Sequence, residues 1–283
     1  MEYRNIVAIL TLIFYTPFLL LSALLIHRHG FRQSWTTWFV LATFALSRLA
    51  WASLQLATLR VAAATLAADA LSPLLFCALG LVARLRGVLA RVVGVPVDDV
   101  KPPPRLLGLL DLVVTAAFIC ASVGYRGLSS EDVREGMSES PEVIQAAAYL
   151  YIVALAGIVG GAGVVGVMGV LYRREMPEGE GRALWVLLGS LPLLVVRTVY
   201  FAVDVLGNVR SFSAIYGNVT LFLCMGLVVE AVVASSYLGV GFTLKVVSKE
   251  ELEEQKKKET REGDEESGNV ALWDRTRTRL GSS

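Results

Sequence analysis

Seven long apolar segments follow one another through the first 244 residues, and they restrict the fold more than any other feature of the sequence. A helix that crosses a bilayer needs about 20 mostly apolar residues. In lipid, every backbone N–H and C=O group must form its hydrogen bond within the spanning structure, and a single segment meets this requirement as an α-helix. The sequence therefore predicts an all-α, polytopic membrane protein, whose domain of residues 1–244 contains seven transmembrane helices at about 5–26, 35–59, 63–83, 105–125, 145–172, 183–206 and 215–243.

The boundary between the second and third segments is the least distinct division in this pattern. Only Arg60 and a run of alanines separate the two segments, so the turn between them must be very tight. An alternative count of six helices, in which one of these segments is merged or does not span, stays open.

Charge is distributed very unevenly along the chain. The sequence is 55% hydrophobic and 18% charged, with a formal net charge of +1. Residues 245–283 contain dense blocks of like charge, which are typical of a disordered tail. The small net charge gives no reason to expect a nucleic-acid partner. We expect membrane lipids as partners of the body, and a cytoplasmic protein as a candidate partner of the tail.

Basic residues in the connections favour one orientation in the membrane. The loops 27–34, 84–105 and 173–182 contain ten Lys and Arg, whereas the connections on the opposite side contain five. Such loops are retained on the cytoplasmic side. The sequence therefore predicts that the N-terminus lies outside and the C-terminus in the cytoplasm. It does not distinguish the plasma membrane from an internal membrane.

Several ionisable side chains lie inside the predicted helices. A charge at bilayer depth costs roughly 2.5 to 3.5 kcal/mol on insertion scales, so each must face a partner or water and not lipid. In the sixth segment, three polar residues are spaced i, i+3, i+7 and share one helix face. The candidate binding residues, which would form an intramembrane polar network, are Arg48, Asp69, Arg197, Tyr200, Asp204 and Glu230.

The depths of these residues predict which of them meet. At about 1.5 Å per residue, Arg48 and Asp69 differ in depth by roughly 7 Å, which an arginine side chain spans. Arg197 and Glu230 differ by roughly 9 Å, at the edge of reach, and Asp204 competes for Arg197. We expect these five charged residues to form one network, with Glu230 as the candidate proton-binding group. A purely structural role for the network is the alternative.

The fifth segment is rich in glycine, with Gly157 and Gly161 in small-xxx-small spacing. Small residues at this spacing let another helix approach closely. We expect that neighbour to be in the same chain, with a second copy of the chain as the alternative.

Several kinds of chemistry have no support in the sequence. The three cysteines, Cys77, Cys120 and Cys224, are dispersed in apolar runs without metal or disulfide spacing. The only histidines, His27 and His29, lie at a predicted interface, and no lysine inside a predicted helix is available for a retinal Schiff base. With no catalytic spacing and no ATP-binding loop pattern, we expect no enzyme activity, no metal and no cofactor.

Motifs in the C-terminal half of the body resemble a known family. These are Arg197-x-x-Tyr200, the acid at 204, residues 218–225, and Glu230 followed by Tyr237-Leu-Gly-Val-Gly241. They resemble a fungal family of seven-helix integral membrane proteins catalogued as a domain of unknown function, and the resemblance covers the body but not the tail. More distantly, the Arg-x-x-Tyr helix is similar to the fungal lipid-translocating exporter-like family, which implies handling of amphipathic compounds.

Two functional hypotheses follow. The first is that the protein handles or transports an amphipathic or lipid-like small molecule through its intramembrane polar network. The alternative is a seven-helix receptor or sensor that signals through its cytoplasmic tail. The absence of an obvious inverted repeat in seven helices counts against a typical secondary transporter.

Overall fold

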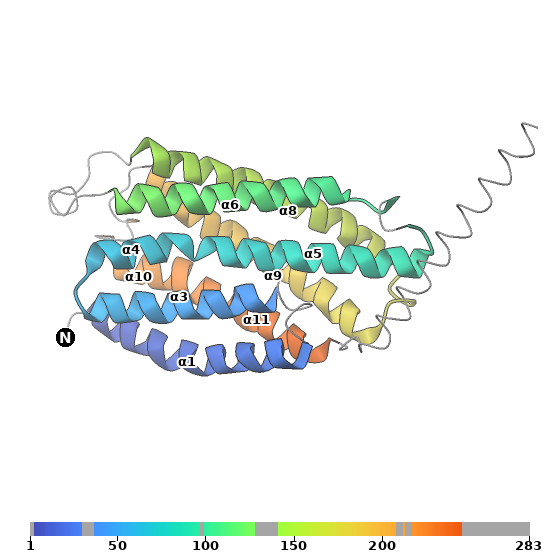
Figure 1. Cartoon of the computed structure of the whole chain (residues 1–283), viewed down its shortest axis with the longest axis horizontal. Coiled ribbons are helices and arrows are strands. Elements are labelled where there is room, and N and C mark those ends of the chain that lie inside the picture. Colours follow the sequence, from blue (N-terminus) through green and yellow to red (C-terminus); the bar gives the residue numbers. More distant parts are fainter. Residues whose placement is uncertain are drawn as a thin grey trace, which may run out of the picture. The chain divides into compact units, whose positions relative to one another are not determined.

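The computed structural model describes residues 3–29, 37–96, 99–127, 141–207, 212 and 217–244, and this part of the chain is helical and contains no strand. Successive spanning helices run in opposite directions beside one another (Figure 1). The helices are α1 Tyr3–His29, α3 Trp38–Leu56, α4 Arg60–Asp69, α5 Leu71–Val93, α6 Pro104–Arg126, α8 Glu142–Leu171, α9 Glu178–Leu206, α10 Val219–Leu221, the π-helix η3 Phe222–Val228 and α11 Val229–Thr243.

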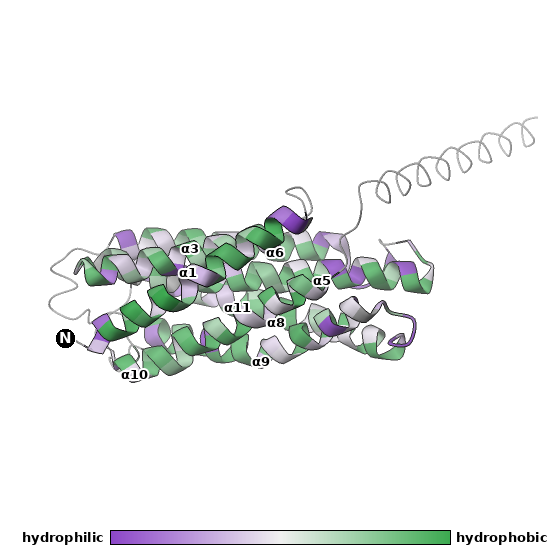
Figure 2. Cartoon of the chain, turned by 90° about the horizontal axis from the view of Figure 1, so that it is seen from below, coloured by the Kyte–Doolittle hydropathy of each residue, from purple (hydrophilic) through white to green (hydrophobic). Residues whose placement is uncertain are grey.

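Seven helical segments of the described chain are long and apolar enough to cross a membrane, which confirms the predicted all-helical fold of a multi-pass membrane protein. The third segment includes α5 and the end of α4, and the seventh consists of α10, η3 and α11. Hydrophobic residues cover most of each labelled helix (Figure 2). Large apolar side chains such as Leu112, Leu20 and Val167 are exposed on the outside of the bundle, as a lipid-facing surface requires.

A tight turn separates the second and third spanning segments. α3 ends at Leu56 and α4 begins at Arg60. Between them Thr58 has a φ of 63°, in the left-handed region that residues other than glycine seldom adopt. The alternative count of six helices is therefore wrong.

The third segment continues well beyond residue 83, where the sequence predicted a loop. α5 ends at Val93, and Gly94 follows it with a left-handed φ of 73°. Two arginines in this extension have partners. Arg84 forms an ion pair with Glu180 of α9 at 2.7 Å, and the Nε of Arg86 donates to the carbonyl of Val100 at 3.1 Å. These contacts let the helix extend although it carries charge.

α5 lies at the centre of the bundle, where it packs against α3, α6, α8 and α9. The glycines of α8 allow two neighbours to approach closely. A Cβ atom at Gly157 would lie 2.3 Å from Leu110 of α6, and one at Gly169 would lie 2.6 Å from Leu184 of α9. The prediction that this glycine-rich helix packs within its own chain is confirmed.

We call the end of the bundle at which α1 begins the N-terminal end, and the opposite end the C-terminal end. At the N-terminal end, α1 begins and α3, α6 and α9 finish (Figure 1). At the C-terminal end, α5, α8 and α11 finish. The predicted tail, residues 245–283, lies outside the described residues.

Candidate functional site

A triad of charged side chains lies inside the bundle, where Glu230 faces two arginines from different helices. The Nε of Arg197 in α9 donates to Oε1 of Glu230 at 2.5 Å, and Nη2 of Arg48 in α3 forms an ion pair with Oε2. The three side chains are 0–2% exposed. This Arg48–Glu230–Arg197 triad therefore joins the second, sixth and seventh spanning segments through one shared carboxylate.

The start of the last helix explains why Arg197 and Glu230 meet more easily than predicted. The last helical segment begins at Val219 and not at the predicted residue 215. Counted from this start, Glu230 lies nearly as deep in the bundle as Arg197, whose depth is counted from the end of α9 at Leu206. η3 then ends directly before Val229, so Glu230 is in the first turn of α11. The sequence correctly placed both residues on facing helices, but it overestimated the difference in their depths.

Arg197 has a second partner in the broken third segment. Its Nη2 donates to the backbone carbonyl of Ala67 at 3.0 Å. Ala67 lies in the last turn of α4, and the last carbonyls of a helix have no partner within it. The interruption between α4 and α5 at Ala70 therefore supplies an acceptor for a buried guanidinium group.

The expected pair between Arg48 and Asp69 does not form. Both carboxylate oxygens of Asp69 accept from the hydroxyl of Ser122 in α6, each at 2.9 Å. Arg48 forms its ion pair with Glu230 instead, and no ion pair joins Arg48 to Asp69. The observed helix ends place Arg48 and Asp69 at nearly the same depth, so the predicted difference in depth was too large. The pair fails to form because Asp69 lies on the face of α4 that packs against α6, which depth alone does not define.

Tyr200 and Asp204 extend from the triad towards the N-terminal end of the bundle. The guanidinium carbon of Arg197 lies 5.6 Å from the centre of the Tyr200 ring, a cation–π contact. Asp204 is half-buried on the same helix. Tyr125 of α6, which the sequence did not single out, is buried about one turn after Ser122, the partner of Asp69. The expected single network is thus a tight triad with a looser group beside it.

The triad and two tyrosines, Tyr15 and Tyr200, contain polar atoms that have no hydrogen-bond partner among the described residues. They are Nε and Nη1 of Arg48, Nη1 of Arg197, and the hydroxyl groups of Tyr15 and Tyr200, all of them buried. The contact of Arg48 Nη2 with Glu230 Oε2 is an ion pair without hydrogen-bond geometry. Most buried polar groups in proteins are paired, so these atoms mark an unusual place.

Tyr15 belongs to the site although the first helix carries no charge near it. Its ring packs edge-on against Phe44 with centroids 5.7 Å apart, and the guanidinium carbon of Arg48 lies 5.8 Å from the Phe44 centroid. The available signal was the spacing of Thr11, Tyr15 and Ser22 at i, i+4, i+11, which places these polar residues on one helix face.

Two buried hydroxyl pairs also connect helices that the sequence did not link. Ser72 of α5 bonds to Tyr151 of α8 at 2.5 Å, and Ser190 of α9 bonds to Tyr237 of α11 at 2.8 Å. Within the described part of the chain, no group of three or more His, Cys, Asp or Glu side chains is placed to hold a metal ion.

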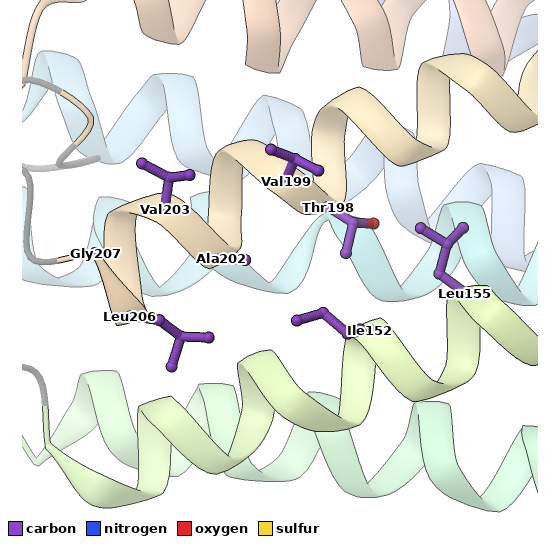
Figure 3. Close-up of a pocket in the computed structure, with 8 residues that line it drawn as sticks. All are labelled: Ile152, Leu155, Thr198, Val199, Ala202, Val203, Leu206 and Gly207. Atoms are coloured by element: carbon purple, nitrogen blue, oxygen red, sulfur yellow. The ribbon is translucent and has the colours of Figure 1, made fainter.

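An apolar groove lies between α8 and α9 towards the N-terminal end (Figure 3). Its volume is about 510 Å³. The only side-chain oxygen in its lining belongs to Thr198, and that hydroxyl donates to the Leu194 carbonyl at 2.9 Å. The lining residues are Ile152, Leu155, Thr198, Val199, Ala202, Val203, Leu206 and Gly207.

Comparison with protein families gives a match to a domain of unknown function (DUF7702) over residues 1–247. The chain belongs to this family. The DUF7702 match covers the whole seven-helix body and thus includes the triad and the groove. It agrees with the predicted resemblance to a family of unknown function that covers the body. Comparison with curated proteins and comparison with solved structures gave no match.

Proposed function

We propose that this DUF7702 protein binds an amphipathic or lipid-like small molecule within the membrane and handles or translocates it. The observation that supports this proposal is the buried Arg48–Glu230–Arg197 triad with its unpartnered donors. Ionisable residues at bilayer depth commonly mark substrate or ion pathways, because their insertion is costly. The proposed role is binding and movement, not catalysis.

The energetics of buried ion pairs support a use beyond stability. Desolvation of buried charges often offsets their mutual attraction, so apolar residues of similar volume would hold the three helices together about as well. In this triad the donors of Arg48 and Arg197 also exceed the acceptors that Glu230 offers. Surplus donors add desolvation cost and no stability, which favours a binding role.

The groove between α8 and α9 suits the apolar part of such a molecule. It is lined almost entirely by aliphatic atoms, and it lies on a helix that also holds Arg197. Thr198, the residue next to Arg197, belongs to the lining. We propose that an acyl chain occupies this groove. The similarity of the Arg-x-x-Tyr helix to the lipid-translocating exporter-like family supports the same class of ligand.

We further propose that the N-terminal end of the bundle faces outward and that the C-terminus is cytoplasmic. The excess of basic residues in the loops at the C-terminal end supports this orientation. Labelling of single cysteines with an impermeant reagent in intact cells tests it. Reaction at Ala57→Cys, between α3 and α4, and protection at Glu175→Cys, between α8 and α9, are the expected results. The reverse pattern would contradict the orientation.

The binding proposal can be tested with purified protein in phosphatidylcholine nanodiscs and a fluorescent fatty acid. Val203→Trp fills the groove and should weaken binding. Val167→Trp, at a position on α8 that is 63% exposed and outside the groove lining, should bind like the wild type. Equal binding by both variants would refute the groove, and absence of saturable binding by the wild type would refute the proposed function for fatty acids. The receptor alternative depends on residues 245–283, which lie outside the described residues.

A further inference from the structure

We propose that Arg48 and Arg197 form a binding site for a small anionic group, reached from the N-terminal end along the seam between α1, α3 and η3. This inference deepens the proposed function, since it identifies the polar group of the ligand as an anion. It rests on the proposed function in one respect only, namely that the anion is part of a larger amphipathic molecule.

Apart from Arg48 Nη2 and Glu230 Oε2, which form an ion pair with each other, the unpartnered atoms at the triad and on the two tyrosines beside it are able to donate. Arginine has five N–H donors and no acceptor, and a tyrosine hydroxyl donates one hydrogen bond. Three buried guanidinium nitrogens, two on Arg48 and one on Arg197, and the hydroxyl groups of Tyr15 and Tyr200 have no described partner. Only a group that brings acceptors can satisfy these donors together.

The charge of the triad points in the same direction. Two guanidinium groups share one carboxylate, so the triad is positive by one charge. The carboxylate of Asp69 lies outside the triad, where it accepts from the hydroxyl of Ser122, a neutral donor that leaves its charge unchanged. A single negative charge would therefore balance the triad. A carboxylate fits best, because its two oxygens match the planar fork of a guanidinium group.

A small cavity lies between α1, α3 and the α10–η3 segment, on the side of Arg48 that faces the N-terminal end of the bundle. Arg48, Trp51 and Gln55 lie at i, i+3, i+7 on one buried face of α3. Trp51 and Gln55 line a cavity of about 10 Å³ together with Arg4, Val7, Val219 and Phe222, which belong to α1 and to the α10–η3 segment. That volume holds about one water molecule.

A π-helix, η3, lies beside this seam. η3 runs from Phe222, which lines the cavity, to Val228, two residues before Glu230. Single π-helical turns occur mostly as bulges inside α-helices, frequently at functional sites. Return of η3 to α-helical geometry would rotate Phe222 relative to Trp51, whose rings now lie 5.5 Å apart.

Binding can be measured with the intact chain in phosphatidylcholine nanodiscs, titrated with sodium acetate and separately with decanoate at constant ionic strength. The readout is the rise in melting temperature with concentration, from which an apparent Kd follows. Tyr15→Phe removes a hydroxyl that has no protein partner, so it should fold normally. Arg48→Gln removes the main donors. Tyr149→Phe and Arg91→Gln alter exposed residues and are the matched controls.

We expect saturable stabilisation of the wild type by acetate, with Tyr15→Phe and Arg48→Gln weakening it about tenfold or more, since each variant removes a hydrogen bond to the charged ligand. The two controls should match the wild type. No saturable effect of either anion would overturn the inference. So would equal anion binding by Tyr15→Phe, Arg48→Gln and the controls.

The two probes separate this inference from the proposed function. Stabilisation by both acetate and decanoate that depends on Tyr15 supports an anionic headgroup. Stabilisation by acetate alone supports a site for free anions and refutes an acidic amphiphile as the ligand. Decanoate binding that Val203→Trp abolishes and Tyr15→Phe leaves unchanged would support the groove and overturn the anion site.

Discussion

Replacement of Glu230 by glutamine tests the triad most directly. The substitution keeps the size of the side chain but removes the one carboxylate that Arg48 and Arg197 share. Loss of one partner of a buried ion pair costs about 3 to 5 kcal/mol, because the remaining charge stays buried without compensation. Here two arginines that are 0–2% exposed would lose their counter-ion at once. We therefore expect a loss of about 4 kcal/mol or more.

The loss is large relative to the stability of a typical domain, about 5 to 15 kcal/mol, so the variant should remain folded only marginally. Unfolding can be followed through the thiol of Cys77, which is fully buried. Cys120 and Cys224, which are more accessible, should first be replaced by serine. The rate or midpoint at which Cys77 becomes reactive then reports the opening of the bundle centre.

Glu180→Gln is the matched control for this variant. Glu180 also pairs with an arginine, but the Arg84 side chain is 24% exposed. Water can replace part of that interaction, so we expect a loss of about 1 kcal/mol or less. A loss at Glu230 no greater than at Glu180 would refute the argument that two buried arginines depend on this one carboxylate.

A compensating variant makes the test sharper. Arg48→Met, Arg197→Met and Glu230→Leu together remove every charge of the triad while keeping similar volumes. Replacement of buried ion pairs by apolar residues is often neutral or stabilising by about 1 to 4 kcal/mol. The triple variant should therefore be much more stable than Glu230→Gln. If its ligand binding is lost while its stability is kept, the triad serves binding and not folding.

Two further predictions concern packing and hydroxyl pairs. Gly157→Ala should be less stable than Gly160→Ala by about 1 kcal/mol or more, because a Cβ at Gly157 meets Leu110 at 2.3 Å whereas nothing lies within 4 Å at Gly160. Equal melting temperatures of the two purified variants would contradict this packing. Ser190 donates to the Leu187 carbonyl at 2.7 Å, so Tyr237 must be the donor in their 2.8 Å bond. Ser190→Ala should then cost about 1 to 3 kcal/mol by leaving the Tyr237 hydroxyl buried and unpaired, and adding Tyr237→Phe should recover part of that loss, as a double-mutant cycle would measure. Strictly additive losses would show that the pair does not interact.

Hydropathy and length determined the helical fold before any tertiary contact was considered. Lipid offers no hydrogen bonds, so an apolar run of sufficient length has to be a helix. The seven spanning segments could therefore be predicted one by one. The same reasoning identified Arg48, Arg197 and Glu230 as unusual, because a charge inside such a run is costly wherever its partner lies. The spacing of Gly157 and Gly161 also predicted the close approach of another helix, but the structure identified Leu110 of α6 as the neighbour.

The partners of the charged residues depended on the tertiary structure. Depth along a helix can be counted from the sequence, but the rotation of a helix about its axis and local breaks in its geometry depend on packing. Because of the break between α4 and α5, the Ala67 carbonyl accepts a hydrogen bond from Arg197. Because α4 packs against α6, the Asp69 carboxylate accepts a hydrogen bond from Ser122. The later start of the last segment brings Glu230 level with Arg197. Tyr15 enters the site only because α1 packs against α3. Sequence alone thus determined which charges are buried in the membrane, and packing alone decided that two arginines share one carboxylate.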